Sequence, residues 1–266
     1  MSKRFLHRFI LAMLLSQAAA GSGLAQDVEE LTKTFKQALE FGKEGRFDSA
    51  IAEMKKIRAA MPDFPDAYRK LGEWYSEVDQ HRKALEMWKE YRQRAPEDWR
   101  AHEGLIQTYQ ALGETGLRDQ EREELFRLRK SSDIPELHQL TRYCRERFRV
   151  GGQRVTAYES FEPSAAQGRI YEFWVLQYKE GYDLLYYLGS SDLETQIGRD
   201  LGEVRATERR YFLDYNIAEG ERFKERGLLE FFDLEQPPSY EFVRDQVVKR
   251  LAQPPGEWKS KSVIVE

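Results

Sequence analysis

Acidic side chains are the groups in this 266-residue sequence that could most readily take part in catalysis. Six of them lie on or beside aromatic and β-branched stretches, where two carboxylates facing each other across a cleft could act as general acid and base. They are Glu159, Glu162, Asp183, Asp192, Asp214 and Glu230. Their spacing fixes no separation, and arginines such as Arg154, Arg169 and Arg210 stand ready to pair with them. Carboxylate catalysis is therefore an alternative hypothesis and not the leading one.

Histidine and cysteine are scarce, with four His and one Cys in the whole chain. His81, His102 and His138 have no partner at the spacing of metal ligands. No His follows His138, and no G-x-S-x-G, G-x-G-x-x-G or Walker-type motif is present. We interpret Cys144 as a small buried hydrophobe, with a reactive thiol as the alternative. The sequence therefore predicts no catalytic set, no metal site and no cofactor.

Residues 1–25 have the layout of a secretory signal peptide. Three Lys or Arg residues up to Arg8 precede a short apolar core over 9–15, and small residues up to Ala25 offer a cleavage site. This core is much shorter than the roughly 20 apolar residues of a membrane span. We expect cleavage after Ala25, a secreted or periplasmic location, and no stable membrane insertion of the mature chain.

The charge of the chain argues against several classes of partner. The formal net charge is −4, and loss of the three basic residues of the signal gives −4 − 3 = −7. Charged residues make up 33% of the chain and both signs are interspersed. Such a surface suits neither phosphate backbones nor anionic lipids, so we expect no nucleic-acid partner. One cysteine permits no internal disulfide, so the fold must depend on its hydrophobic core.

A helical pattern recurs along the chain from Asp27 to about residue 130. Within Pro65–Pro96, two helical patterns follow each other with a turn at Asp79. Ala50 and Ala84 lie 34 residues apart, and other matched positions repeat at the same step. A fixed step of this size is typical of a helical repeat array.

The recurring positions closely resemble the tetratricopeptide repeat (TPR). They are Ala38, Phe41, Gly45, Phe47, Ala50, Ile57 and Pro62 in the first unit, and Leu71, Gly72, Tyr75, Ala84 and Pro96 in the second. A third unit begins at Trp99, but Gly116 interrupts its second helix and Arg118 stands where a small residue is expected. The resemblance covers about residues 28–130 and implies an all-α solenoid of stacked helical hairpins.

In TPR solenoids the first helices of successive repeats line a concave groove, so the resemblance implies a surface that binds a protein or peptide. Its lining would include Thr32, Phe35, Leu39 and Lys43, then Arg69, Glu73 and Glu77, then Arg100, Glu103 and Gln107. Arg69 and Arg100 could meet a partner's carboxylate through charge-assisted hydrogen bonds. Alternatively, Glu73 and Glu103 neutralise them, or the groove holds the protein's own second domain.

Beyond the repeats, Leu137, Leu140 and Cys144 fall at helical spacing, which predicts a capping helix over 134–147. After Arg149, runs of aromatic and β-branched residues predict five strands. Turns over 163–168 and 179–181 join the first three, and such short connections predict antiparallel neighbours. These strands are Arg154–Phe161, Arg169–Tyr178, Tyr182–Leu188, Arg210–Tyr215 and Leu228–Leu234.

The second and third of these strands are apolar on both sides, so we expect both faces of the sheet to be covered there and Trp174 to be buried. Two amphipathic helices, Asp192–Leu201 and Tyr240–Leu251, are available to cover the sheet.

The sequence thus predicts an α+β chain: a signal peptide over 1–25, a TPR-like domain over 26–147, an α+β domain with an antiparallel, aromatic-rich sheet over 150–252, and a tail over 253–266. The leading hypothesis is an exported, non-enzymatic scaffold or adaptor that binds a protein partner, in the cell envelope if the host is a bacterium. One alternative is an enzyme with a carboxylate site in the second domain, to which the repeats recruit substrate. Another is a carbohydrate-binding or oligomerisation surface built from Tyr and Trp side chains.

Overall fold

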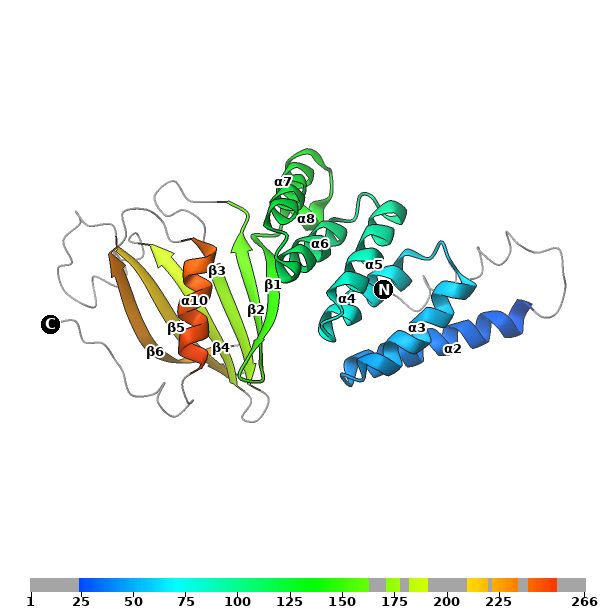
Figure 1. The fold of residues 1–266 in the computed structure, drawn as a ribbon, viewed down its shortest axis with the longest axis horizontal. Coiled ribbons are helices and arrows are strands. Elements are labelled where there is room, and N and C mark those ends of the chain that lie inside the picture. Colours follow the sequence, from blue (N-terminus) through cyan, green and yellow to red (C-terminus); the bar gives the residue numbers. More distant parts are fainter. Residues whose placement is uncertain are drawn as a thin grey trace. The chain divides into compact units, whose positions relative to one another are not determined.

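A computed structural model of the protein shows helices followed by an antiparallel sheet (Figure 1). It describes residues 24–162, 171–177, 182–190, 210–219, 222–233 and 239–252. Most of the predicted signal peptide, the helix predicted over 192–201 and the tail lie outside these residues and stay predictions. Among the helices of the described ranges, none combines the length and apolar character that a membrane span requires.

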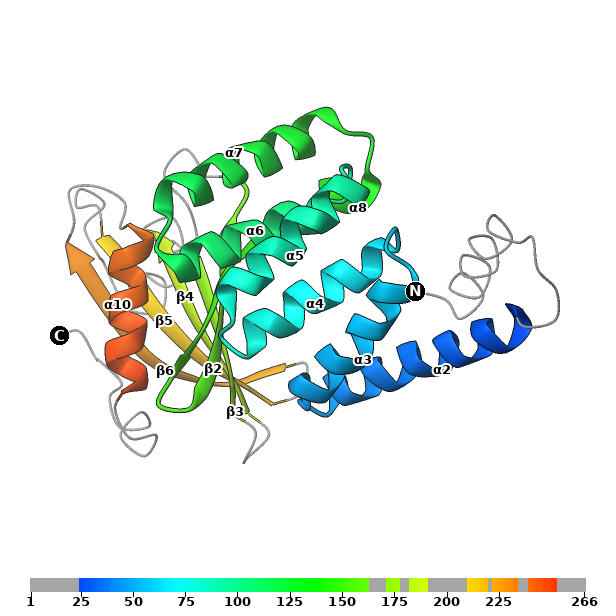
Figure 2. The ribbon, with the colours of Figure 1, turned by 45° about the vertical axis from the view of Figure 1, so that its right-hand side comes forward.

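The first part of the chain consists of helical hairpins. The helices are α2 (Leu24–Lys43), α3 (Phe47–Ala60), α4 (Pro65–Glu77), α5 (His81–Arg94), α6 (Trp99–Leu112) and α7 (Thr115–Ser131). Figure 2 shows them following one another as antiparallel pairs. The starts of α3 and α5 at Phe47 and His81, and of α4 and α6 at Pro65 and Trp99, are both 34 residues apart. This recurrence confirms the predicted helical-repeat architecture.

Small residues let these helices pack closely. Ala38, Ala50 and Ala84 are fully buried in one continuous core together with larger side chains such as Trp88. The Trp88 ring lies against Gly72 of α4 and Gly104 of α6, and a Cβ at either glycine would come closer than 3.0 Å to it. The predicted interdigitation of small and large residues is therefore confirmed.

The second helix of the third hairpin differs from the prediction. Gly116 does not interrupt α7, because it lies in the first turn, where a glycine disturbs little of the helix. Arg118, at the expected small position, is buried and donates from Nη1 to Oε1 of Gln110 at 2.6 Å. Leu125 is buried, whereas Leu117 is 42% exposed, so the predicted apolar face of α7 is only partly formed.

The capping helix predicted over 134–147 is wrong. Helix α8 covers only Pro135–His138, and Arg142–Val150 forms strand β1. The physical reason is pairing: β1 joins β2 (Gln153–Ser160) through Gly151 and Gly152, which have positive φ angles of 56° and 83° as a tight hairpin turn requires. Cys144 is buried within β1, in agreement with the interpretation of a small hydrophobe.

The sheet has six strands in the order β1 to β6, and each neighbouring pair is antiparallel. The other strands are β3 (Tyr171–Gln177), β4 (Tyr182–Ser190), β5 (Arg210–Glu219) and β6 (Arg222–Asp233). All five predicted strands are present, and β1 is the strand that the sequence did not indicate. The chain divides into two compact units, Met1–Glu121 and Arg122–Glu266, whereas the sequence placed the domain boundary between 147 and 150.

Helix α10 (Tyr240–Leu251) covers one face of the sheet, as predicted (Figures 1 and 2). Phe173 of β3 is fully buried and stacks on Tyr240, with 5.7 Å between the ring centroids. Trp174 points to the opposite face and is only partly buried, so the prediction of its burial is wrong. There the Arg142 guanidinium lies 5.5 Å from the centroid of the Trp174 ring, a polar environment that a filled core would not provide.

Candidate binding groove and a buried polar network

The residues predicted to line the groove are polar side chains on the first helices of the hairpins. Lys43 ends α2; Arg69, Glu73 and Glu77 lie on α4; and Arg100, Glu103 and Gln107 lie on α6. All seven are partly buried or exposed. Because α4 contacts α6, the structure brings the second and third groups onto neighbouring helices. Lys43 pairs with Glu40 of its own helix at 2.7 Å.

Two apolar residues predicted for the groove belong to the core. Phe35 is buried and packs edge-to-face against Phe64, with 5.6 Å between the ring centroids. Leu39 is partly buried against the same cluster. Both therefore belong to the core of the repeats, where Phe35 joins α2 to the start of α4. The inclusion of Phe35 in the groove lining is wrong because its side chain is buried.

Arg69 is held between two carboxylates of its own helix. Its Nε and Nη2 donate to Oδ1 of Asp66 at 3.0 and 2.6 Å, and its Nη1 donates to Oε1 of Glu73 at 2.7 Å. Burial alone would lower the pKa of Arg69, but Glu73 and Asp66 outweigh it and raise that pKa. The positive charge is thus balanced locally, which is the neutralised alternative weighed for this residue.

Arg100 is the more accessible of the two predicted arginines, with 49% of its side chain exposed. Asp98 caps α6 by accepting from the Arg100 backbone N at 2.9 Å, and it also accepts from the Tyr91 hydroxyl at 2.5 Å. Burial, together with this hydrogen bond, raises the pKa of Tyr91. The Arg100 guanidinium reaches Asp98 only at 3.2 Å, so it can exchange this contact for a partner's carboxylate at little cost.

A second polar cluster, which the sequence did not indicate, joins three helices of the first unit. Glu121 of α7 accepts from Nη1 of Arg92 at 2.5 Å and lies 2.9 Å from Nδ1 of His102. Burial would raise the pKa of Glu121, but the His102 hydrogen bond and the Arg92 charge outweigh it and lower that pKa. The cluster therefore fixes α7 against α5 and α6 through an ionised carboxylate.

Glu121→Gln is expected to lower the free energy of unfolding at pH 7 by about 1–3 kcal/mol, because it removes the charge from these hydrogen bonds. The folded-state pKa of Glu121 is lowered, so its contribution is present above the ordinary glutamate pKa of about 4.3 and is lost as the pH falls below it. Urea unfolding followed by circular dichroism should show the deficit at pH 7 and a smaller one near about pH 3.5. Glu124→Gln, at an exposed pair with Arg127, is the control. A deficit of equal size at both pH values would contradict the assignment.

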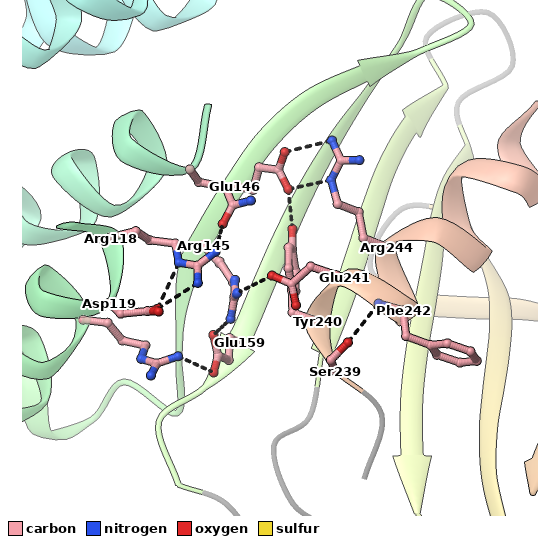
Figure 3. A network of polar contacts seen from close by, with 12 residues as sticks. Arg118, Asp119, Arg145, Glu146, Glu159, Ser239, Tyr240, Glu241, Phe242 and Arg244 are labelled. Carbon is pink, nitrogen blue, oxygen red and sulfur yellow. Dashed lines mark hydrogen bonds and ion pairs between the residues drawn. The ribbon is translucent and has the colours of Figure 1, made fainter. Parts of the chain in front are cut away.

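A buried network of ion pairs lies in the second unit (Figure 3). Glu159 of β2 is fully buried and accepts from the Tyr143 hydroxyl at 2.5 Å and from Nη1 of Arg145 at 2.6 Å. Nη1 of Arg122 lies 4.0 Å from its other oxygen. The Arg145 guanidinium, in turn, stands 3.9 Å from the centroid of the Tyr240 ring. A carboxylate from β2 is thereby joined to β1 and, through Arg145, to α10.

The second buried carboxylate, Glu146 of β1, has its own cation. Arg244 of α10 donates to both of its oxygens, at 2.8 and 2.9 Å, and the Tyr240 hydroxyl donates at 2.6 Å (Figure 3). The hydrogen bond to Glu146 is the main cause that raises the pKa of Arg244. Since both donors come from α10, this half of the network holds that helix to the sheet.

The tyrosines and arginines of this network are poorly suited to proton transfer near neutral pH. Burial and the adjacent Glu159 raise the pKa of Tyr143, and burial and Glu146 raise that of Tyr240. Burial opposes the charge of Arg145, yet Glu159 outweighs it and the pKa of Arg145 is raised. Phenols and guanidinium groups with raised pKa values keep their protons, whereas a general base needs a pKa near the working pH.

Sequence reasoning placed only Glu159 of this network among the candidate carboxylates. Glu162 is exposed and pairs with Arg129, and Asp192 lies outside the described residues. Asp183, Asp214 and Glu230 lie on β4, β5 and β6 and come opposite Leu176, Tyr187 and Leu213 in the ladder. In the described part of the chain, no three His, Cys, Asp or Glu side chains gather as a metal site would need.

Comparisons with known proteins give weak likenesses. No protein-family model and no curated protein matches the chain. Among solved structures, MamA AMB-1 is 14% identical with a TM-score of 0.38, over 44% of this chain and 64% of that one, so less than two thirds of that MamA chain is matched. The TPR domain of Sgt2 from Aspergillus fumigatus is 15% identical with a TM-score of 0.36, over 41% of this chain and 73% of that one. A chain of a T3SS complex from Aeromonas hydrophila is 15% identical with a TM-score of 0.40, over 48% of this chain and 85% of that one.

Residues 28–130 have a TPR-like fold. The hairpins themselves carry this assignment: both helices recur after 34 residues, and the small positions at Ala50, Gly72 and Ala84 are buried at the helix crossings. The binding role of the groove residues stays a prediction.

Proposed function

We propose that this protein is an exported, non-enzymatic scaffold whose TPR-like repeats bind a protein or peptide partner along α2, α4 and α6. The observation that carries the proposal is the rigid core beneath these helices, from Phe35 to Tyr109, in which small residues and tryptophan rings interlock. A surface built on such a core is pre-organised, so a partner binds without the entropic cost of ordering the helices. The polar side chains above the core would then provide specificity.

The partner's chemistry follows from the charges that are available on α4 and α6. Arg69 is already engaged with Asp66 and Glu73, whereas Arg100 holds Asp98 only loosely and half of its side chain is exposed. Arg100 is thus the better candidate to bind an acidic group of the partner. Location in a cell envelope, proposed from the signal-like N-terminus, would place this partner among exported proteins.

Arg100→Glu is expected to reduce recovery of the partner by at least about tenfold in a pull-down from an envelope fraction, because it places a like charge opposite an acidic group. Arg69→Gln should have a smaller effect, since Arg69 already binds two carboxylates. Lys56→Glu on α3 is the control, because this exposed lysine lies on the second helix of a hairpin and pairs with Glu53 of its own helix. Unchanged recovery with Arg100→Glu would remove the groove from the proposal.

The enzyme alternative gains no support from the buried network. Glu146 and Glu159 each bind an arginine and a tyrosine, and neither belongs to the hollow described below. We therefore keep the non-enzymatic scaffold as the proposed function.

A further inference from the structure

The second unit contains a hollow of about 470 Å³ that plays no part in the proposed groove. It lies where the end of α7, helix α8 and the residues after β2 meet. Its lining consists of Phe126, Arg129, Lys130, His138, Phe161 and Glu162. Its size falls within the range of small-ligand sites, about 300–1,000 Å³.

One wall of the hollow is aromatic. The rings of Phe126 and Phe161 contact each other, with 5.4 Å between their centroids. The Arg129 guanidinium lies 4.9 Å from the centroid of the Phe161 ring. The two rings are tilted by 54° to each other, so they form an angled apolar surface beside a cation. Such a surface suits a ligand that carries an apolar body and a negative head group.

The charged part of the lining is mainly basic. Arg129, Lys130 and His138 stand against a single acid, Glu162. Nε of Arg129 is buried and has no hydrogen-bond partner within the described residues, and Lys130 makes no ion pair there. His138 Nε2 lies 2.6 Å from the carbonyl oxygen of Ser132 and therefore donates to it, which fixes the ring. Arg129 and Lys130 thus keep hydrogen-bond donors for an anionic ligand.

The contact between Arg129 and Glu162 is the kind that a ligand can replace. The two groups lie 2.8 Å apart, but the Glu162 side chain is 78% exposed. Exposed ion pairs contribute little because water competes for both charges. A ligand carboxylate that also contacts Lys130 and the phenylalanine wall would therefore displace Glu162 from Arg129.

Arg129 and Lys130 also lie in the last turn of α7, where positive charge interacts favourably with the helix dipole. That role accounts for their charge. It does not account for the aromatic wall or for the buried Nε–H of Arg129 that lacks an acceptor.

We propose that this hollow binds a carboxylate attached to an aromatic or other apolar group. The carboxylate lies on Arg129 and Lys130, and the apolar group lies on Phe126 and Phe161. The same chemistry is presented by a small aromatic acid and by the C-terminal residue of a peptide that ends in phenylalanine.

Calorimetric titration of the full chain with N-acetyl-L-phenylalanine and with its amide tests the proposal. The acid should bind at least about tenfold more tightly than the amide, because only the acid provides the charge-assisted hydrogen bonds. Lys130→Gln should weaken binding of the acid, and Glu162→Gln should strengthen it by removing the competing carboxylate. Arg127→Gln, on the same helix but outside the lining, should leave the affinity unchanged.

Equal affinity for acid and amide, no binding at millimolar concentration, or weaker binding by Glu162→Gln would overturn the proposal. Because Lys130 and Glu162 are exposed, neither variant endangers the fold, and circular dichroism would verify this. A tripeptide that ends in phenylalanine separates the two sources. Tighter binding of the tripeptide would indicate a peptide terminus, and equal binding would indicate the small acid.

Discussion

Replacement of Glu159 by Gln is expected to destabilise the second unit by about 3–5 kcal/mol. Glu159 is fully buried, and its replacement removes the buried charge that compensates the guanidinium of Arg145, which is only 4% exposed. Within the described residues, the ion pair that Arg145 then keeps is its 3.3 Å contact with Glu241, whose side chain is 61% exposed. A buried charge without a partner is far more costly than the pair itself is stabilising. Urea unfolding followed by circular dichroism measures the loss as an early transition of the sheet. Glu162→Gln, at an exposed pair, is the matched control and should change stability by less than about 0.5 kcal/mol.

A double substitution separates the ion pair from mere packing. Arg145→Met combined with Glu159→Leu removes both charges together, so neither charge is left buried without its partner. Of the buried groups, the Tyr143 hydroxyl loses its acceptor, which costs less than an uncompensated charge. We expect this double variant to be more stable than Glu159→Gln alone, since apolar replacements of buried pairs are often neutral or stabilising. A double variant that is less stable than the single one would show that the network does not act as a compensated charge pair.

The repeats could be predicted from the sequence because their signal is local and recurs. Ala50 and Ala84 occupy equivalent crossings, and the 34-residue step that relates them in the sequence also relates α3 to α5 in the structure. The same pattern occurs in several units, so one atypical position, such as Arg118, does not change the predicted fold. In a stack of repeats each unit contacts only the units next to it, and these are also its neighbours in the sequence.

The sheet was harder to predict where local and long-range preferences compete. Leu137, Leu140 and Cys144 match a helical period, but Arg145, Arg147 and Arg149 alternate, as a strand does. Pairing with β2 decided in favour of the strand, and the turn at Gly151–Gly152 made that pairing local. The alternating arginines were the signal that could have indicated β1.

The buried network was not predictable because its members are far apart in the sequence. Glu146 on β1 binds Arg244 on α10, nearly one hundred residues later, and neither residue has a distinctive neighbourhood. Similarly, the sequence places Arg69 and Arg100 on the correct helices, but it does not decide which carboxylates they pair with. Whether Arg69 meets Glu73 or a partner depends on side-chain geometry that periodicity does not encode.

Trp88→Ala is expected to destabilise the repeats by about 3–5 kcal/mol, as deletion of a large buried aromatic side chain does. The indole lies between Gly72 of α4 and Gly104 of α6, so its loss opens a cavity that three helices share. Circular dichroism at 222 nm during urea unfolding is the appropriate measurement, because fluorescence would change with the loss of the tryptophan itself.

Gly104→Ala tests the same contact, because its effect on stability should change sign when Trp88 is removed. Gly104→Ala in the natural chain should be destabilising by about 1–3 kcal/mol, because the new Cβ would collide with the Trp88 ring. In the Trp88→Ala background the collision is absent, and alanine is a better helix former than glycine by about 1 kcal/mol. There Gly104→Ala should therefore stabilise the protein and partly fill the cavity. If Gly104→Ala destabilised both backgrounds equally, the close approach of Trp88 to α6 would not be what keeps glycine at this position.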